Sequence, residues 1–301
     1  MQNNTAKGVA YVLFSMAVWS GWMVVSRFAV QGSLNSYDIT ALRFTTAGLI
    51  LLPMVIRKGL KIGPWGYWSA LVLSILGGAA YVNVAIAGMK FAPASHVSTV
   101  INGTMFLTIT LFGIHGLKES LPRMRLMGVL CSCAGIVCIF VAKSKHSDPD
   151  EWLGHLLFIA SGFMFGCYTI LARAWKVDVF HAVAVVSVLS MITYMPIYWA
   201  LGLSHITLAN WHEAAFQAAY QGALTAVIAF ITFNIAVHIL GAAHAGAFIP
   251  LVPVISTLMA IPVLGEVPTA LEWTGVGTVS LGVFLASGVL QWRPGKAPEI
   301  K

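Results

Sequence analysis

A short motif occurs twice in this chain, and the spacing of its two copies constrains the fold. Glu119 lies in LKESLP and is followed by Gly128, and Glu266 lies in LGEVP and is followed by Gly275. Both the glutamates and the glycines are 147 positions apart. The apolar segments of each copy are sufficient for about five membrane helices. Because five is odd, the second copy must be inverted in the membrane relative to the first, and inverted repeats of this kind are typical of alternating-access transporters.

The composition excludes an ordinary soluble domain. Of the 301 residues, 58% are hydrophobic and 9% are charged, and the mean hydropathy is +0.85. A soluble domain has about 25% charged residues. The formal net charge of +7 does not indicate nucleic-acid binding, because the basic residues are scattered singly between apolar runs. We therefore expect most of the surface to face a lipid bilayer and expect no nucleic-acid partner.

Ten apolar segments are long enough to cross a membrane. They cover approximately residues 8–30, 38–56, 66–88, 93–114, 124–142, 152–172, 179–202, 212–239, 244–264 and 273–292. The longest polar connection, residues 143–151, lies between the two copies. The expected fold is an all-α membrane protein of ten transmembrane helices, with a first repeat at 8–142, a linker at 143–151 and an inverted second repeat at 152–292.

Lysine and arginine predict the orientation of the chain. With the N-terminus in the cytoplasm, the inside segments hold twelve of these residues and the outside segments hold three, namely Lys90, Lys143 and Lys145. Cytoplasmic loops carry the excess of basic residues in membrane proteins. We therefore expect a multi-pass protein of the bacterial inner membrane with both termini in the cytoplasm.

Several motifs resemble those of an EamA domain. In the second copy these are a proline at Pro253, the sequence Leu264-Gly265-Glu266, and a last helix with Gly275, Gly277 and Gly282. In the first copy, Trp19-Ser20-Gly21 and Ala41-Leu42-Arg43-Phe44 look like the opening of such a domain. Over about residues 8–290, the chain resembles the ten-helix tandem EamA-domain proteins of the drug/metabolite transporter superfamily. The resemblance implies a central cavity lined by helices 1–4 and 6–9, with helices 5 and 10 at the periphery, and mostly efflux of small metabolites.

Aromatic pairs on the first helix of each copy are candidates for the cavity wall. Trp19 and Trp22 are three residues apart and share a helix face. Aligning Gly8 with Gly154 places Phe165 and Tyr168 at the corresponding positions. Two such walls suit a flat or apolar solute or a cation, and the alternative is packing against helices or lipid.

Two arginines lie within predicted spans. An arginine at the centre of a span costs about 2.5–3.5 kcal/mol on insertion scales, so Arg43 is expected to face the protein interior. It either captures a substrate carboxylate or makes a structural pair, and its counterpart in the second copy is Val186. Arg27 is nearer the interface, where we expect it to extend toward the headgroups.

Other polar groups in the spans supply further candidates. Tyr81, Asn102 and Asn234 are candidates for cavity contact, with hydrogen bonding between helices as the alternative. His96 and His244 occupy equivalent positions at the start of the fourth helix of each copy and are candidates for proton coupling. The Asn102-Gly103 pair and the Pro250/Pro253 pair are expected to loosen these two helices. His155, like His115, His181, His205 and His212, is expected at the membrane interface.

The sequence favours transport over catalysis. All ten acidic residues map to loops or span ends, and no phosphate loop, zinc spacing or nucleophile motif is present. We expect no enzymatic activity, no cofactor and no metal, and expect the four cysteines to pack as small residues. The expected function is export of small metabolites, with aromatic or apolar amino acids favoured. The alternative is efflux of cationic drugs or quaternary amines. The expected partners are a small-molecule substrate and the bilayer, and a monomer is compatible with both.

Overall fold

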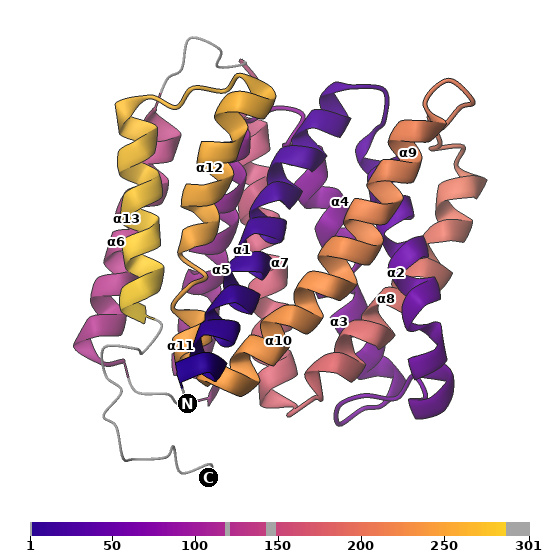
Figure 1. Cartoon of the computed structure of the whole chain (residues 1–301), viewed down its shortest axis with the longest axis horizontal. Coiled ribbons are helices and arrows are strands. Elements are labelled where there is room, and N and C mark those ends of the chain that lie inside the picture. Colours follow the sequence, from indigo (N-terminus) through magenta and orange to yellow (C-terminus); the bar gives the residue numbers. More distant parts are fainter. Residues whose placement is uncertain (1, 118–120, 143–148, 287–301) are drawn as a thin grey trace.

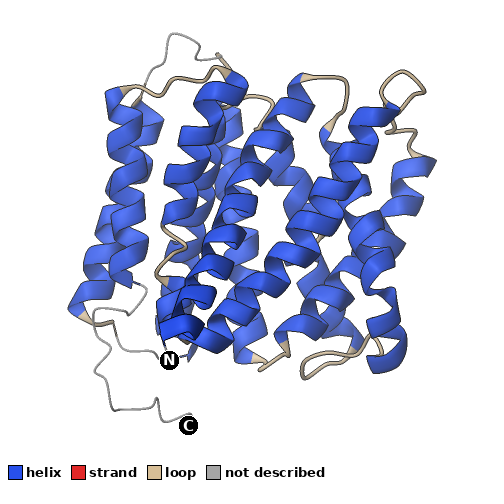
Figure 2. Cartoon of the chain, viewed as in Figure 1, coloured by secondary structure: helices blue, strands red, loops and turns tan. Residues whose placement is uncertain are grey.

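The computed structural model describes residues 2–117, 121–142 and 149–286, and the regular structure in these ranges is helical (Figure 2). The helices are α1 (Gln2–Gln31), α2 (Ser36–Lys58), α3 (Tyr67–Gly77), α4 (Ala79–Gly88), α5 (Ala94–Leu117), α6 (Arg123–Val141), α7 (Glu151–Ala174), α8 (Val179–Ala200), α9 (Trp211–Gln217), the π-helix η1 (Ala218–Ile228), α10 (Ala229–Leu240), α11 (Ala242–Gly246), α12 (Leu251–Leu264) and α13 (Ala270–Ala286).

Three of the membrane spans contain more than one helix. Helices α3 and α4 form the third span, α9, η1 and α10 form the eighth, and α11 with α12 forms the ninth. Within the described residues, nine segments are long and apolar enough to cross a membrane, and α13 is a shorter apolar helix that supplies the tenth. The chain is a multi-pass membrane protein, and the prediction of an all-α fold with ten membrane helices is confirmed.

Helices α6 and α13, the last of each copy, pack against each other in opposite directions at one edge of the bundle (Figure 1). A side chain on Gly128 would meet the carbonyl oxygen of Gly282 at 2.5 Å, and one on Gly135 would meet that of Gly275 at 2.8 Å. Gly128 and Gly275 are 147 positions apart, as are Gly135 and Gly282. Small residues permit this close approach of membrane helices. The repeated glycine of the motif therefore has a structural reason, and the antiparallel contact fits an inverted repeat.

Breaks in the helices occur in the third, eighth and ninth spans. The third span breaks at Gly78, between α3 and α4, where the hydroxyl of Ser190 accepts a hydrogen bond from the amide of Ala79 at 3.1 Å. The eighth span is π-helical over Ala218–Ile228, a geometry that is rare and is found frequently at functional sites. The ninth span breaks between α11 and α12, next to Pro250.

The expectation that Asn102-Gly103 loosens the fourth helix is wrong. Helix α5 continues from Ala94 to Leu117 without a break. A side chain on Gly103 would meet the Cδ1 atom of Ile136 at 2.9 Å, so the glycine here makes room for α6. The two copies therefore differ, with an intact helix in the first and a broken one in the second.

Some predictions fall on parts of the chain outside the described residues. Glu119 of the first motif and most of the 143–151 linker lie there. Helix α6 ends at Val141 and α7 begins at Glu151. The boundaries of the two repeats and their linker stay predictions.

Candidate functional site

A cavity of about 470 Å³ lies at the centre of the bundle. Its lining residues come from α1, α2, α3, α4, α5, α7, α8, η1, α10 and α12, and from Ile249 just before α12. Helices α6 and α13 contribute none of them. This volume is within the usual range for small-molecule sites, about 300–1,000 Å³.

Aromatic side chains form two walls of the cavity. On one side Tyr81 stacks on Phe165 with ring centroids 4.8 Å apart, and Phe165 stacks on Tyr168 at 5.3 Å. On another side Trp19 packs against Phe233 with ring centroids 5.2 Å apart. The second wall thus contains a residue that was not singled out from the sequence, Phe233. Both aromatic pairs named from the repeat line the same cavity, and their role in binding stays a prediction.

Arg43 lines the cavity from α2 and is only partly satisfied by the protein. Its Nη1 donates to Oε1 of Gln221 at 3.5 Å, which is a long hydrogen bond. Its guanidinium carbon lies 5.5 Å from the centroid of the Trp22 ring, within range of a cation–π interaction. Its Nε is buried and has no hydrogen-bond partner among the described residues.

Three further lining residues carry buried polar atoms that lack partners among the described residues. These atoms are Nε1 of Trp22, Nδ2 of Asn102 and Oγ1 of Thr225. Each of them is a hydrogen-bond donor, as is the Nε of Arg43. A buried donor left unpaired costs about 1–3 kcal/mol, so such groups require an explanation.

The cavity lies at mid-depth in the bundle. Arg43 and Phe44 line it from the first half of α2, toward the end opposite the N-terminus, and other lining residues lie nearer the N-terminal end. Its lining residues on α8 are Val183, Val186 and Ser187, in the first half of that helix, and those on α7 are Phe165, Tyr168 and Thr169, in the second half. The end of α7 and the start of α8 lie at the same end as the N-terminus (Figure 1).

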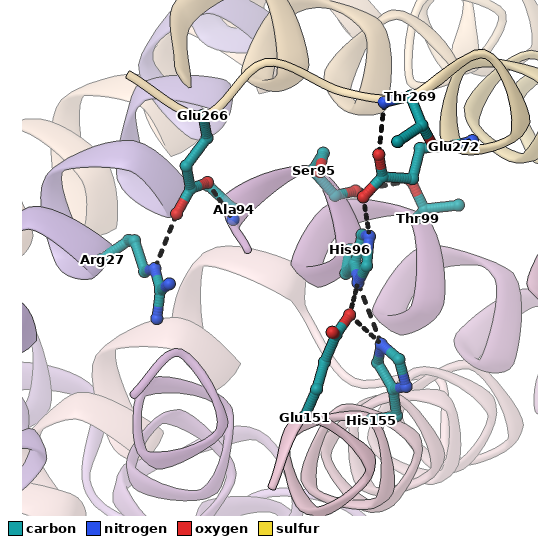
Figure 3. A network of polar contacts seen from close by, with 10 residues as sticks. All are labelled: Arg27, Ala94, Ser95, His96, Thr99, Glu151, His155, Glu266, Thr269 and Glu272. Atoms are coloured by element: carbon teal, nitrogen blue, oxygen red, sulfur yellow. Dashed lines mark hydrogen bonds and ion pairs between the residues drawn. The ribbon is translucent and has the colours of Figure 1, made fainter. Parts of the chain in front are cut away.

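At the end of the bundle opposite the N-terminus, polar contacts join the two copies. Arg27 of α1 pairs with Glu266, its Nε lying 2.9 Å from Oε1, and its Nη1 donates to the carbonyl oxygen of Met89. The other oxygen of Glu266 accepts from the amide of Ala94 at the start of α5, at 2.7 Å (Figure 3). The expectation that Arg27 extends to the headgroups is wrong, because this carboxylate, distant in sequence, holds it inside the protein.

The remaining predicted site residues lie elsewhere. Asn234 is not among the lining residues, and its side chain donates to the carbonyl oxygen of Phe230 at 2.8 Å. His244 is exposed in α11, whereas His96 is fully buried in the first turn of α5. The structure does not bring the two histidines together, and neither lines the cavity. Proton coupling through them stays a prediction.

His96 belongs to a buried polar cluster with Glu151, His155 and Glu272 (Figure 3). His155 lies near the start of α7, and it is 4% exposed and packed between helices. Its place at the membrane interface stays a prediction. Two local signals pointed to the cluster. Glu151 and His155 are four residues apart on one helix face, and Thr269 with Glu272 has the spacing of a capping box.

The fold and the cavity define a membrane transporter built from an inverted repeat. The EamA-like transporter family matches residues 6–141 and 152–288, and the chain belongs to this family. An uncharacterized transporter of Archaeoglobus fulgidus is 25% identical over 279 residues, 91% of this chain and 94% of that protein. The uncharacterized inner membrane transporter YedA of Escherichia coli K12 is 21% identical over 290 residues, 93% of this chain and 90% of its own.

A solved crystal structure, described only as that of a protein, has the same fold. It matches with a TM-score of 0.57 at 20% identity and covers 93% of this chain and 96% of its own. The relatives and the cavity agree on a general transport role.

Proposed function

We propose that this protein exports small carboxylate-bearing metabolites across the bacterial inner membrane by alternating access, with aromatic and apolar amino acids as its substrates. One observation carries the proposal. Four of the residues that line the cavity, Trp22, Arg43, Asn102 and Thr225, each carry a buried donor without a partner among the described residues, next to stacked aromatic walls. A carboxylate supplies acceptors for several donors at once, and a side chain of matching shape fills the space between the rings.

The charges around the cavity favour an anionic group on the substrate. Arg43 is the one charged residue among those that line it, and aspartate, glutamate and lysine are missing from that set. A guanidinium binds a carboxylate with good geometry, and its buried setting strengthens the attraction. The aromatic faces of the walls can hold the ammonium group of an amino acid.

The position of the Arg27–Glu266 pair fits export. With both termini in the cytoplasm, as the distribution of lysine and arginine predicts, this pair lies at the outer side of the bundle and the cavity lies at mid-depth. A solute would enter from the cytoplasm. Breaking the pair while the inner side closes would then release the solute outward, and the breaks in the third, eighth and ninth spans offer places for the helices to bend.

Efflux of cationic drugs is the alternative. Its support is the same set of aromatic walls, which suits a quaternary amine. The guanidinium of Arg43 counts against it, because like charges in a buried site repel strongly.

Efflux from proteoliposomes separates the two functions. Vesicles are loaded in parallel with labelled phenylalanine, with phenylalanine amide, which has no carboxylate, and with choline. We expect phenylalanine to leave faster than the amide, and expect the difference to disappear in Arg43→Gln. Efflux of the amide and choline at rates equal to or above that of phenylalanine would overturn the proposal and favour the cationic alternative.

A further inference from the structure

The buried cluster of His96, Glu151, His155 and Glu272 lies outside the cavity. Its members come from the starts of three helices, α5, α7 and α13, at the end of the bundle opposite the N-terminus. Their side chains are 1%, 10%, 5% and 3% exposed, respectively. None of them lines the cavity, so substrate binding does not explain the cluster.

Three potential ligand atoms of the cluster converge on one point. Nδ1 of His96 lies 2.9 Å from Nε2 of His155 and 3.0 Å from Oε1 of Glu151, and the latter two atoms are 3.5 Å apart. Tetrahedral zinc with bonds of about 2.0–2.1 Å places its ligand atoms about 3.3 Å from one another. The triangle formed by these three atoms therefore has nearly the size of one face of a zinc coordination tetrahedron. Two histidines with one carboxylate are also a ligand set known from zinc sites.

The fourth residue, Glu272, orients His96. Its Oε1 lies 2.7 Å from Nε2 of His96, and because an ionised carboxylate only accepts, the hydrogen must be on Nε2. In the neutral ring, Nδ1 then directs a lone pair toward Glu151 and His155. Glu272 is itself fixed, because it accepts from the amide of Thr269, and its own amide donates to the Thr269 hydroxyl at 3.3 Å. A carboxylate behind a histidine ligand is the usual outer partner of a protein-bound metal.

The charges of the cluster also favour a cation. Glu151 and Glu272 lie in the first turns of their helices, where the helix dipole stabilises the ionised carboxylate. With Nε2 of His155 also unprotonated, as a metal ligand requires, three acceptor atoms face one point and repel one another unless a cation lies among them. A divalent ion bound to Glu151 and the two histidines would offset the charges of both carboxylates.

We propose that His96 Nδ1, His155 Nε2 and Glu151 Oε1 bind one divalent transition-metal ion, with Zn²⁺ the best match, and that Glu272 is the outer partner of His96. The fourth coordination position is left for water or a mobile ligand. The ion ties α5 of the first copy to α7 of the second, and through Glu272 to α13. This site is independent of the proposed substrate, and the sequence alone predicted no metal.

The test is metal binding by the purified full chain in detergent, after removal of metal with a chelator and alkylation of the cysteines. Isothermal titration with Zn²⁺ is expected to give one ion per chain, and Co²⁺ is expected to give the visible absorption of a tetrahedral site. Glu272→Gln should weaken Zn²⁺ binding about 10- to 100-fold, as the loss of an outer partner does. His155→Ala and Glu151→Gln should weaken it more than that.

Matched controls are His115→Ala and His212→Ala, which remove exposed histidines and should leave the Zn²⁺ affinity unchanged. Gel filtration identifies variants that do not fold, and the near-isosteric Glu151→Gln keeps the test informative if His155→Ala fails to fold. Zn²⁺ binding that is equal in Glu151→Gln and in the controls would overturn the proposal. So would the absence of binding of Zn²⁺ and Co²⁺ to the unmodified chain, which would leave a proton as the cation of the cluster.

Discussion

Arg27 and Arg43 lie on neighbouring helices near the same end of the bundle, and their surroundings differ. Arg27 pairs with Glu266 and donates to the carbonyl oxygen of Met89. Arg43 has one long contact to Gln221 and an Nε without a partner among the described residues. Both carry the cost of placing a guanidinium in a membrane span. For Arg27, the pair with Glu266 offsets this cost and also joins the two copies. For Arg43, part of the cost remains, and a ligand could offset it.

The largest effect should follow from breaking the Arg27 pair. Glu266→Ala leaves a buried guanidinium without its carboxylate and removes the acceptor for the amide of Ala94. Removal of one partner of a buried pair costs about 3–5 kcal/mol. We expect a large fall in the thermal midpoint of the detergent-solubilised protein, measured by fluorescence-detected unfolding.

The double variant Arg27→Met/Glu266→Gln is the matched control for that loss. It removes both charges, while the glutamine oxygen still accepts from the amide of Ala94. Its midpoint should lie close to that of the unmodified chain. A double variant as unstable as Glu266→Ala would show that the charge pair is not the source of the effect.

Arg43→Gln should reduce transport and leave stability unchanged, whereas Glu266→Ala is expected to reduce stability. A hydrogen bond to a charged group contributes about 1.5–3 kcal/mol, which corresponds to about a 10- to 100-fold loss of transport efficiency for a carboxylate substrate. Because the side chain is incompletely paired in the protein, its removal should not lower the thermal midpoint. Initial rates of phenylalanine efflux from proteoliposomes, with the midpoint measured in parallel, check both parts. A fall in stability with unchanged efflux would place Arg43 in the same structural class as Arg27.

The sequence showed that Arg27 and Arg43 lie within membrane spans, but it did not show which of them has a partner in the protein. Hydropathy and repeat spacing predicted the ten spans, and a charge or ring in the middle of a span made Arg43 and Trp19 candidates for the cavity. The partner of Arg27 is 239 positions away, so no local pattern pointed to it. The burial of His155 likewise depends on residues distant in sequence or on other helices, namely His96 of α5 and Phe140 of α6.

The geometry of the eighth span, which carries Asn234, was also not accessible from the sequence. The pattern of apolar residues assumes 3.6 residues per turn along the whole span. The eighth span is π-helical over Ala218–Ile228, so it turns less per residue before α10 begins. In α10, which follows, Phe230 and Phe233 line the cavity, whereas Asn234 donates to the carbonyl oxygen of Phe230.

Trp22 lies next to Arg43 and has both a ring face and an N–H group, and the contributions of these two groups can be separated. Trp22→Phe keeps an aromatic face for the guanidinium and removes the Nε1 donor, which is buried without a partner among the described residues. A neutral hydrogen bond contributes about 0.5–1.5 kcal/mol, so we expect a loss of phenylalanine efflux of about 3- to 10-fold. Trp22→Ala should lose more, since the ring contact is also removed. Equal efflux in the phenylalanine variant and the unmodified chain would show that the indole N–H does not contact the substrate.

The smallest expected loss of efflux concerns two asparagines. Like the two arginines, one has a partner in the protein and the other has none among the described residues, but neither is charged. Nδ2 of Asn234 donates to the carbonyl oxygen of Phe230, whereas Nδ2 of Asn102 is buried at the cavity without a partner among the described residues. Asn102→Ala should lower phenylalanine efflux about fivefold, the value of one neutral hydrogen bond, and should not lower the thermal midpoint. Asn234→Ala, its matched control, should leave efflux unchanged. If the two variants lost efflux equally, an unpaired donor at this cavity would not identify a substrate contact. The inference that Arg43 contacts the substrate would then depend on its charge alone.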